Sequence, residues 1–271
     1  MNPSSEMIVL DDSNAIHAIH SPPNSGRHTF VFANSSGANT ATWEAAIAPA
    51  LRAAGYGTLS FDYRGQGLTQ FGAEARLSPD EIVGDIMTVM DRVAPARPIL
   101  VGLSIGGLYA SRAILHGTTA EGLVLINTLR KQNAQVEWIN TLEERLIGLG
   151  GMPLVLDVLR PVLSGCDQLE KLRDTHLPDE GYTPWPADHP RRRLAEQVKQ
   201  ANWDIAWQDL KLPVLIFTGL HDRLFRIQED VDDLTGLLPN AKTITYPDGG
   251  HSLQAEYPDR FVADLIRFVK G

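Results

Sequence analysis

Residues 98–107 read PILVGLSIGG, and this stretch decides the fold. A short apolar run enters a Gly-x-Ser-x-Gly turn centred on Ser104, and a segment with helical patterning follows at 108–115. A strand, a tight turn and a helix in this order are typical of a nucleophile elbow, whose strained backbone exposes the serine hydroxyl above a sheet edge. Gly102 and Gly106 are small because the strand and the helix cross closely there. The alternative is an ordinary exposed serine in a Gly-rich turn.

Length and composition narrow the class of protein. The 271 residues fit one large domain, or one domain with an inserted lid. The formal net charge of −9 repels phosphate backbones and anionic lipid, so we expect neither a nucleic-acid nor a membrane partner. Residues 1–6 lack the features of a signal peptide and are candidates for disorder. No stretch reaches the ~18 apolar residues of a membrane span, so we expect a cytoplasmic location by default. The sequence leaves the oligomeric state open.

Strand and helix patterns alternate along most of the chain. This alternation predicts an α/β fold with a mostly parallel, eight-stranded-type sheet and helices on both faces. Ser78 and Pro79 mark one helix start, with a capping hydroxyl followed by proline at the first helical position. We expect strands at 28–33, 57–61, 98–103, 123–127, 213–219 and 241–246, and helices at 42–54, 79–93, 108–115, 227–238 and 258–269.

The alternation stops once, from about Thr128 to Leu212. We predict residues 1–128 and 213–271 as the α/β core and residues 129–212 as an inserted helical cap, or lid. An insertion between two strands of one sheet most simply covers the C-terminal edge of that sheet, where ligands bind in open α/β folds. The cap contains helical patterns at 136–149, 152–163 and 191–201, and a loop with proline and tryptophan at 177–189.

Two later segments supply the partners that a serine nucleophile needs. Asp222 follows the predicted strand at 213–219, and His251, flanked by glycines and a serine, follows the strand at 241–246. A histidine base held by an acid activates the hydroxyl, and the chain order Ser, Asp, His is that of the nucleophile-elbow enzymes. His221 is an alternative base, although adjacent residues of an extended segment point to opposite faces. Asp222 has an alternative role as a helix cap.

An oxyanion hole requires two backbone N–H groups aimed at the developing negative charge. One is expected from Ile105, the residue after the nucleophile. The other is expected from the loop at 34–40, with Ser36 as the first candidate and Ser35 as the second; the alternative is an ordinary polar loop. No histidine pair has ligand spacing with a carboxylate, so we predict no metal, and Cys166 is interpreted as an incidental thiol.

Over residues 25–271 the chain resembles the α/β-hydrolase superfamily. The matching features are the elbow at 102–107, the turn DYRGQG at 62–67, the acid segment at 219–222, the Gly250-His251 pair before a final helix, and the cap-sized insertion. Where many members carry His-Gly, this chain carries Asn34-Ser35. An Asn-Ser-x-Gly segment nine residues before a tryptophan, here Trp43, is similar to the 3-oxoadipate enol-lactonase group.

This resemblance implies a hydrolase for a small lactone or ester, with Ser104, Asp222 and His251 as the triad and Ser36 and Ile105 as oxyanion donors. We therefore expect a serine hydrolase that acts on a small-molecule carboxylic ester or lactone through an acyl-serine and needs no cofactor. The alternatives are a thioesterase or C–C (dione) hydrolase with the same triad, and a ligand-binding homologue without catalysis.

Substrate identity is expected to depend mainly on the cap. Arg130 and Lys131 open the cap, where either could pair with a substrate carboxylate or form a solvated basic turn. The cap tryptophans could line an apolar pocket or serve packing. The candidate substrate-binding residues are Asn34, Ser35, Arg130, Trp138 and Trp185.

Overall fold

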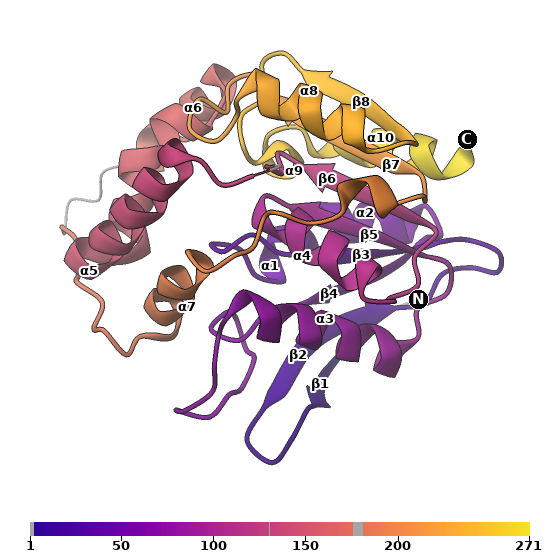
Figure 1. Cartoon of the computed structure of the whole chain (residues 1–271), viewed down its shortest axis with the longest axis horizontal. Helices are drawn as coiled ribbons and strands as arrows, with labels where there is room; N and C mark the ends of the chain where they lie inside the picture. The colour runs from indigo at the N-terminus through magenta and orange to yellow at the C-terminus, as the bar shows by residue number, and fades with distance from the viewer. Residues whose placement is uncertain (1–2, 130, 176–180) are drawn as a thin grey trace.

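A computed structural model describes residues 3–129, 131–175 and 181–271, and it is organised around one mixed sheet (Figure 1). The eight strands lie in the order β1-β2-β4-β3-β5-β6-β7-β8. The β1–β2 and β2–β4 pairs are antiparallel, and all the other pairs are parallel. The strands are β1 (Ser4–Val9), β2 (Ala15–Ser21), β3 (Thr29–Ala33), β4 (Gly57–Phe61), β5 (Pro98–Leu103), β6 (Gly122–Ile126), β7 (Val214–Gly219) and β8 (Ala241–Tyr246).

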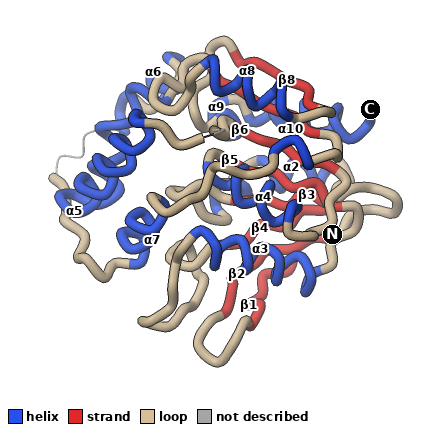
Figure 2. Tube along the Cα trace, viewed as in Figure 1, coloured by secondary structure: helices blue, strands red, loops and turns tan. Residues whose placement is uncertain are grey.

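Helices cover both faces of this sheet (Figure 2). Alternate residues of a strand point to opposite faces, so Val31 of β3 joins the hydrophobic cluster under α3, α4 and α8, whereas Phe30 and Phe32 join the cluster under α1, α2 and α10. The helices of the core are α1 (Ala41–Glu44), α2 (Ile47–Ala53), α3 (Pro79–Val93), α4 (Ile105–Leu115), α8 (Gln228–Leu237), α9 (Leu253–Glu256) and α10 (Pro258–Lys270). The predicted fold class is confirmed.

The N-terminal part of the sheet departs from the sequence prediction. No strand was expected before residue 28, yet β1 and β2 form an antiparallel hairpin at the edge of the sheet, and β1 includes residues from the segment regarded as a candidate for disorder. Five of the six β1 residues are exposed, so the strand lacks the alternation of apolar residues that would have predicted it.

Two helix predictions can be compared in detail. Ser78 caps α3, its hydroxyl accepting from the Glu81 N–H, and the helix spans Pro79–Val93 as expected. The single helix expected at 42–54 is instead two short helices, α1 and α2, because Ala46 adopts a non-helical φ of −147°. Spacing of apolar residues survives such a break, so periodicity alone did not reveal it.

The cap segment, residues 129–212, lies between β6 and β7, and Figure 1 shows its helices to one side of the sheet. Its elements are α5 (Ala134–Leu163), α6 (Cys166–Lys171), α7 (Pro190–Val198) and two 3₁₀ turns, Arg173–Thr175 and Trp207–Asp209. α5 is interrupted at Gly150 and Gly151, where φ is −159° and 66°. The break separates the two helical segments that the sequence predicts at 136–149 and 152–163.

By length and composition, α5 is apolar enough to cross a membrane, contrary to the expectation that no stretch qualifies. Its two halves are each shorter than the ~20 residues that a membrane-spanning helix needs, because the backbone is not helical at Gly150 and Gly151. One face of α5 instead packs in the cap's own hydrophobic cluster, through Leu146, Ile147 and Val155 among others.

Candidate active site

Ser104 occupies the sharp turn between β5 and α4, with φ 55° and ψ −124°, a conformation that L-residues seldom adopt. Its N–H donates to the Ile126 carbonyl (2.8 Å), and its carbonyl accepts from the Thr128 hydroxyl (3.0 Å). A methyl group on Gly102 would lie 2.3 Å from the Gly107 Cα, and one on Gly106 would lie 2.3 Å from the Ala33 carbonyl oxygen. The two glycines thus permit the close strand–helix crossing that the elbow requires.

The predicted acid and base form a direct contact. His251 Nδ1 lies 2.6 Å from Asp222 Oδ2, and Asp222 is 2% exposed. The second Asp222 oxygen accepts from the Phe225 N–H (3.0 Å) and closes the turn after β7. The next helix, α8, has Ile227 at its N-cap, so Asp222 is not the helix cap of the alternative reading. Asp222 therefore fixes the His251 ring with Nδ1 engaged and Nε2 available for a hydroxyl. His221, the alternative base, makes no such contact.

Ser104 and His251 line one cavity of about 410 Å³, a volume typical of small-molecule sites. Phe225 packs beside the imidazole with ring centroids 4.9 Å apart. Ser104 and His251 are both described by the structure, and the Ser104 hydroxyl makes no hydrogen bond to the His251 ring. Such contacts are often long without substrate and tighten when it binds.

Asn127, directly after β6, holds together the two loops that carry Asp222 and His251. Its Nδ2 donates to the Gly250 carbonyl (3.0 Å) and the His251 carbonyl (2.7 Å), and its Oδ1 accepts from the Gly219 N–H (2.9 Å). The side chain is buried and the backbone has φ 45°, which asparagine tolerates better than most residues. Sequence reasoning missed this role, although Asn127 follows a buried strand just as Asp222 does.

The loop that carries Ser36 is fixed by Gln66, another residue that sequence reasoning did not single out. Gln66 Nε2 donates to the carbonyls of Ser35 (2.8 Å) and Ser36 (3.1 Å). Because a trans peptide points its C=O and N–H in opposite directions, the Ser36 N–H faces away from Gln66, and Ser36 lines the cavity. Ile105 is the first residue of α4, where the N–H has no acceptor within the helix.

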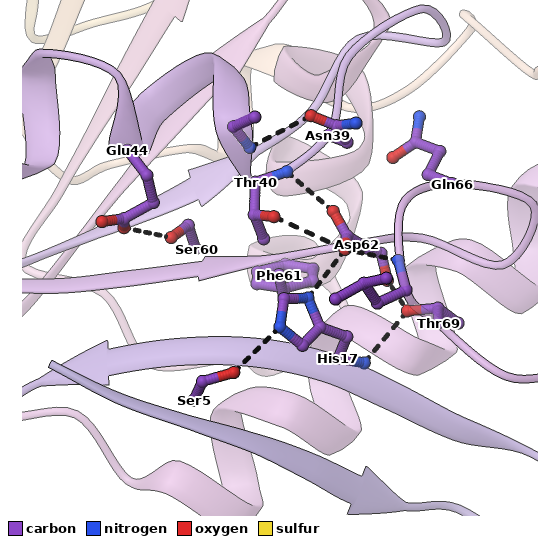
Figure 3. Close-up of polar contacts among 12 residues, drawn as sticks. Ser5, His17, Asn39, Thr40, Glu44, Ser60, Phe61, Asp62, Gln66 and Thr69 are labelled. Atoms are coloured by element: carbon purple, nitrogen blue, oxygen red, sulfur yellow. Dashed lines mark hydrogen bonds and ion pairs between the residues drawn. The ribbon is translucent and has the colours of Figure 1, made fainter.

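Asp62 supports this loop from the core side (Figure 3). Its Oδ1 accepts from the Thr40 N–H (2.7 Å), and its Oδ2 accepts from the Leu68 N–H (3.0 Å) and contacts His17 Nδ1 (2.8 Å). The carboxylate is fully buried, and His17 also contacts the hydroxyl of Ser5 on β1 (3.1 Å). The missed N-terminal hairpin is therefore linked, through His17 and Asp62, to the loop expected to form the oxyanion hole.

Glu256 on α9 joins the histidine loop to the cap. Its Oε2 accepts from the Gly250 N–H (2.9 Å) and the Gly165 N–H (3.1 Å). The residue is 5% exposed and lines the cavity, while Oε1 is buried without a hydrogen-bond partner. Burial raises the pKa of Glu256, and the two N–H donors and the nearby imidazoles of His251 and His221 partly oppose that rise.

The structure places some of the predicted substrate-binding residues at the cavity and others away from it. Ser35 lines the cavity. Asn34 does not line the cavity, because it is fully buried. Its side chain donates to the Phe61 carbonyl (2.8 Å) and accepts from the Trp43 indole (2.8 Å), so it anchors the start of the loop to the core. Arg130 lies outside the described residues. Lys131, which shared its alternative readings, pairs with Asp230 of α8 (3.1 Å).

The two tryptophan predictions are corrected by the structure. Trp138 is 78% exposed, because it lies on the outer face of α5. Trp185 stacks on His189 (4.0 Å between ring centroids) and packs beside Gly151 at the break in α5. Neither side chain lines the cavity that contains Ser104.

Within the described ranges, no cluster of three or more His, Cys, Asp or Glu side chains is suited to hold a metal ion.

Comparisons with known proteins find similar sequences and the same fold. The BpoC protein of Mycobacterium tuberculosis (strain H37Rv), named as a candidate non-heme bromoperoxidase, is 26% identical over 246 residues, 88% of this chain and 92% of that protein. The enol-lactonase from Burkholderia xenovorans LB400 superposes with a TM-score of 0.76 at 22% identity, over 95% of this chain and 97% of that chain. An esterase (EaEST) from Exiguobacterium antarcticum gives 0.78 at 18% identity, over the full length of both chains.

The sequence profile of the alpha/beta hydrolase family matches residues 30–265, which include the elbow, the acid segment and the histidine loop. The profile spans most of the chain, and the fold comparisons cover nearly all of it. This chain therefore belongs to the alpha/beta hydrolase family.

Proposed function

We propose that this hydrolase cleaves a carboxylic ester or lactone bond of a small molecule through an acyl-serine intermediate. The observation that carries the proposal is the 2.6 Å contact between His251 Nδ1 and Asp222 Oδ2, in a cavity that also contains Ser104. Two of the similar proteins are named an enol-lactonase and an esterase, and both names describe hydrolysis at an ester carbonyl.

In the first half of the proposed cycle, Ser104 Oγ attacks the carbonyl carbon while His251 Nε2 takes the hydroxyl proton. Asp222 orients the imidazole and stabilises its cation. The Ser36 and Ile105 N–H groups donate hydrogen bonds to the carbonyl oxygen and stabilise the negative charge that forms on it. The tetrahedral intermediate collapses, the C–O bond breaks, and the leaving alcohol takes the proton from His251.

In the second half, His251 removes a proton from water as the water oxygen attacks the acyl carbon. The bond between Ser104 Oγ and the acyl carbon then breaks, Oγ takes the proton back from His251, and the carboxylic acid is released. Each oxyanion donor contributes on the order of 3 kcal/mol to lowering the barrier, and the triad acts as a unit rather than as a sum of parts. Every step is carried by groups of the chain and by water.

The test is turnover of a panel of p-nitrophenyl esters, simple lactones and thioesters, with Ser104→Ala as the matched control. We expect wild-type activity on esters or lactones, loss of at least 1,000-fold in Ser104→Ala, and an acyl adduct on the Ser104 peptide by mass spectrometry. Equal inactivity of both proteins on the whole panel, with ligand-induced stabilisation retained, would instead support a binding role. Thioester turnover without ester turnover would reassign the substrate class.

A further inference from the structure

Glu143 of α5 brings an acidic side chain into the cavity that contains Ser104 and His251. The side chain is partly buried, and the described residues provide it with no hydrogen bond and no close ion pair. Burial raises the pKa of its carboxyl, and the more distant charges of Arg191 and His251 oppose that rise. A carboxyl that is partly removed from water and has no protein donor loses some solvation free energy that the protein does not return.

Arg191, on α7, is the cation that acts on Glu143, but its guanidinium is engaged elsewhere. It donates a hydrogen bond to the Gly37 carbonyl, in the loop that carries Ser36. Burial lowers the pKa of Arg191, whereas the carboxyl of Glu143 raises it, so the two groups interact without direct contact. The bond to Gly37 therefore fixes Arg191 on the oxyanion loop and leaves the Glu143 oxygens open.

The cap wall on which Glu143 sits is otherwise mainly apolar, built from Met152, Val155 and Leu159 of the same helix. Without substrate, water in the cavity can solvate this carboxyl, and a substrate that displaces the water has to supply a donor in its place. We propose that Glu143 is a specificity-determining residue that binds an N–H donor of the substrate, so that an acyl chain ending in an ammonium group is preferred over one ending in a carboxylate. This inference rests on the proposed hydrolase function.

Other charged residues that line the cavity allow an alternative in which the substrate carries a negative charge. Arg160, beyond the break in α5, and Glu256, bound to two N–H groups, also line the cavity. A substrate carboxylate held by Arg160 would produce the opposite preference. The sign of the charge preference, and its dependence on Glu143, therefore decide between the two readings.

The experiment compares three p-nitrophenyl esters of equal chain length, formed from hexanoic acid, 6-aminohexanoic acid and adipic acid as the monoester. The hexanoate ester is the reference to which the other two kcat/KM values are normalised. We expect the aminohexanoate ester to exceed the adipate ester by at least about 10-fold, and Glu143→Gln to reduce that ratio by about 10-fold or more. Glu144→Gln is the matched control, because Glu144 is the next residue on α5 and pairs with Lys199 away from the cavity.

A second readout separates this inference from the proposed function. In the Ser104→Ala background, calorimetry compares binding of hexylammonium and hexanoate, with and without Glu143→Gln. A preference for hexylammonium that disappears in Glu143→Gln supports the inference even if no ester is turned over. A preference for the carboxylate, or a ratio that Glu143→Gln leaves unchanged, overturns it. If esters are hydrolysed while the ratio does not depend on Glu143, the proposed function stands and this inference fails alone.

Discussion

Replacing Asn127 by aspartate removes the two N–H donors that hold the Gly250 and His251 carbonyls, while keeping the acceptor for the Gly219 N–H. The new carboxylate would face two carbonyl oxygens in a buried site. A buried acceptor that loses its donor costs about 1–3 kcal/mol, so two of them predict a loss of about 2–6 kcal/mol in the free energy of unfolding. Aspartate tolerates the positive φ at this position, so backbone strain is not the cause.

The same substitution should lower kcat more than it changes KM. Asn127 does not line the substrate cavity, but it positions the loops of both His251 and Asp222. A misplacement of catalytic groups by about 1 Å costs about 100-fold in rate. We therefore expect kcat for p-nitrophenyl butyrate to fall by about 100-fold, with KM within about threefold of wild type.

Urea unfolding and steady-state kinetics on the folded fraction measure these two effects separately. Asn240→Asp is the control, since Asn240 is an exposed residue before β8 that donates to the Lys211 carbonyl. Unfolding and kcat of Asn127→Asp equal to those of the control would refute the reasoning. A loss of stability with unchanged kcat would show that the bridge supports the fold without placing the catalytic loops.

Three further results are expected. Gly106→Ala should abolish soluble expression or lower Tm by more than about 10 °C, because its methyl would lie 2.3 Å from the Ala33 carbonyl oxygen, whereas Gly236→Ala, in open space on α8, should be neutral or stabilising. Asn34→Leu should cost about 2–4 kcal/mol in urea unfolding, since it leaves buried partners unpaired. Burial raises the pKa of Glu256, so the native state binds the carboxyl proton more tightly than the unfolded chain does. The free energy of unfolding of the wild type should therefore fall as pH rises above the unfolded-state pKa. Glu256→Gln should lack this pH-dependent component in unfolding curves at pH 4–8, and identical pH profiles for the two proteins would contradict the assignment.

The core of the site could be predicted because its residues obey rules that the sequence displays. Parallel strands end at one edge of the sheet, so polar residues in the loops that follow such strands converge, as Asp222 and His251 do. The glycines of the elbow are required by steric contacts that hold for any strand–helix crossing of this kind. Asn127 also comes at the end of a parallel strand. It was missed because its role depends on hydrogen bonds to backbone carbonyls, and every residue type has a backbone carbonyl, so the sequence gives no sign of such a partner.

The cap could be predicted as helices but not as a binding surface. Trp138 and Glu143 are five residues apart on α5, which places them about 140° apart around the helix axis. Trp138 therefore faces solvent while Glu143 faces the cavity. Residue type favoured the tryptophan as a pocket residue, but the face of a cap helix is set by its packing on the core, which periodicity within one segment does not specify.

The contacts between cap and core indicate that the C-terminal end of α5 supports His251, the proposed base, as well as covering it. The His251 N–H donates to the Leu163 carbonyl (2.6 Å), and the Arg223 N–H, next to Asp222, donates to the Val162 carbonyl (3.0 Å). Glu256 accepts from Gly165 at the same place. A rigid-body opening of the cap would break the hydrogen bonds that place the acid and the base. We therefore expect substrate entry to use motion of the rest of the cap, while the end of α5 stays bound to the loops that carry Asp222 and His251.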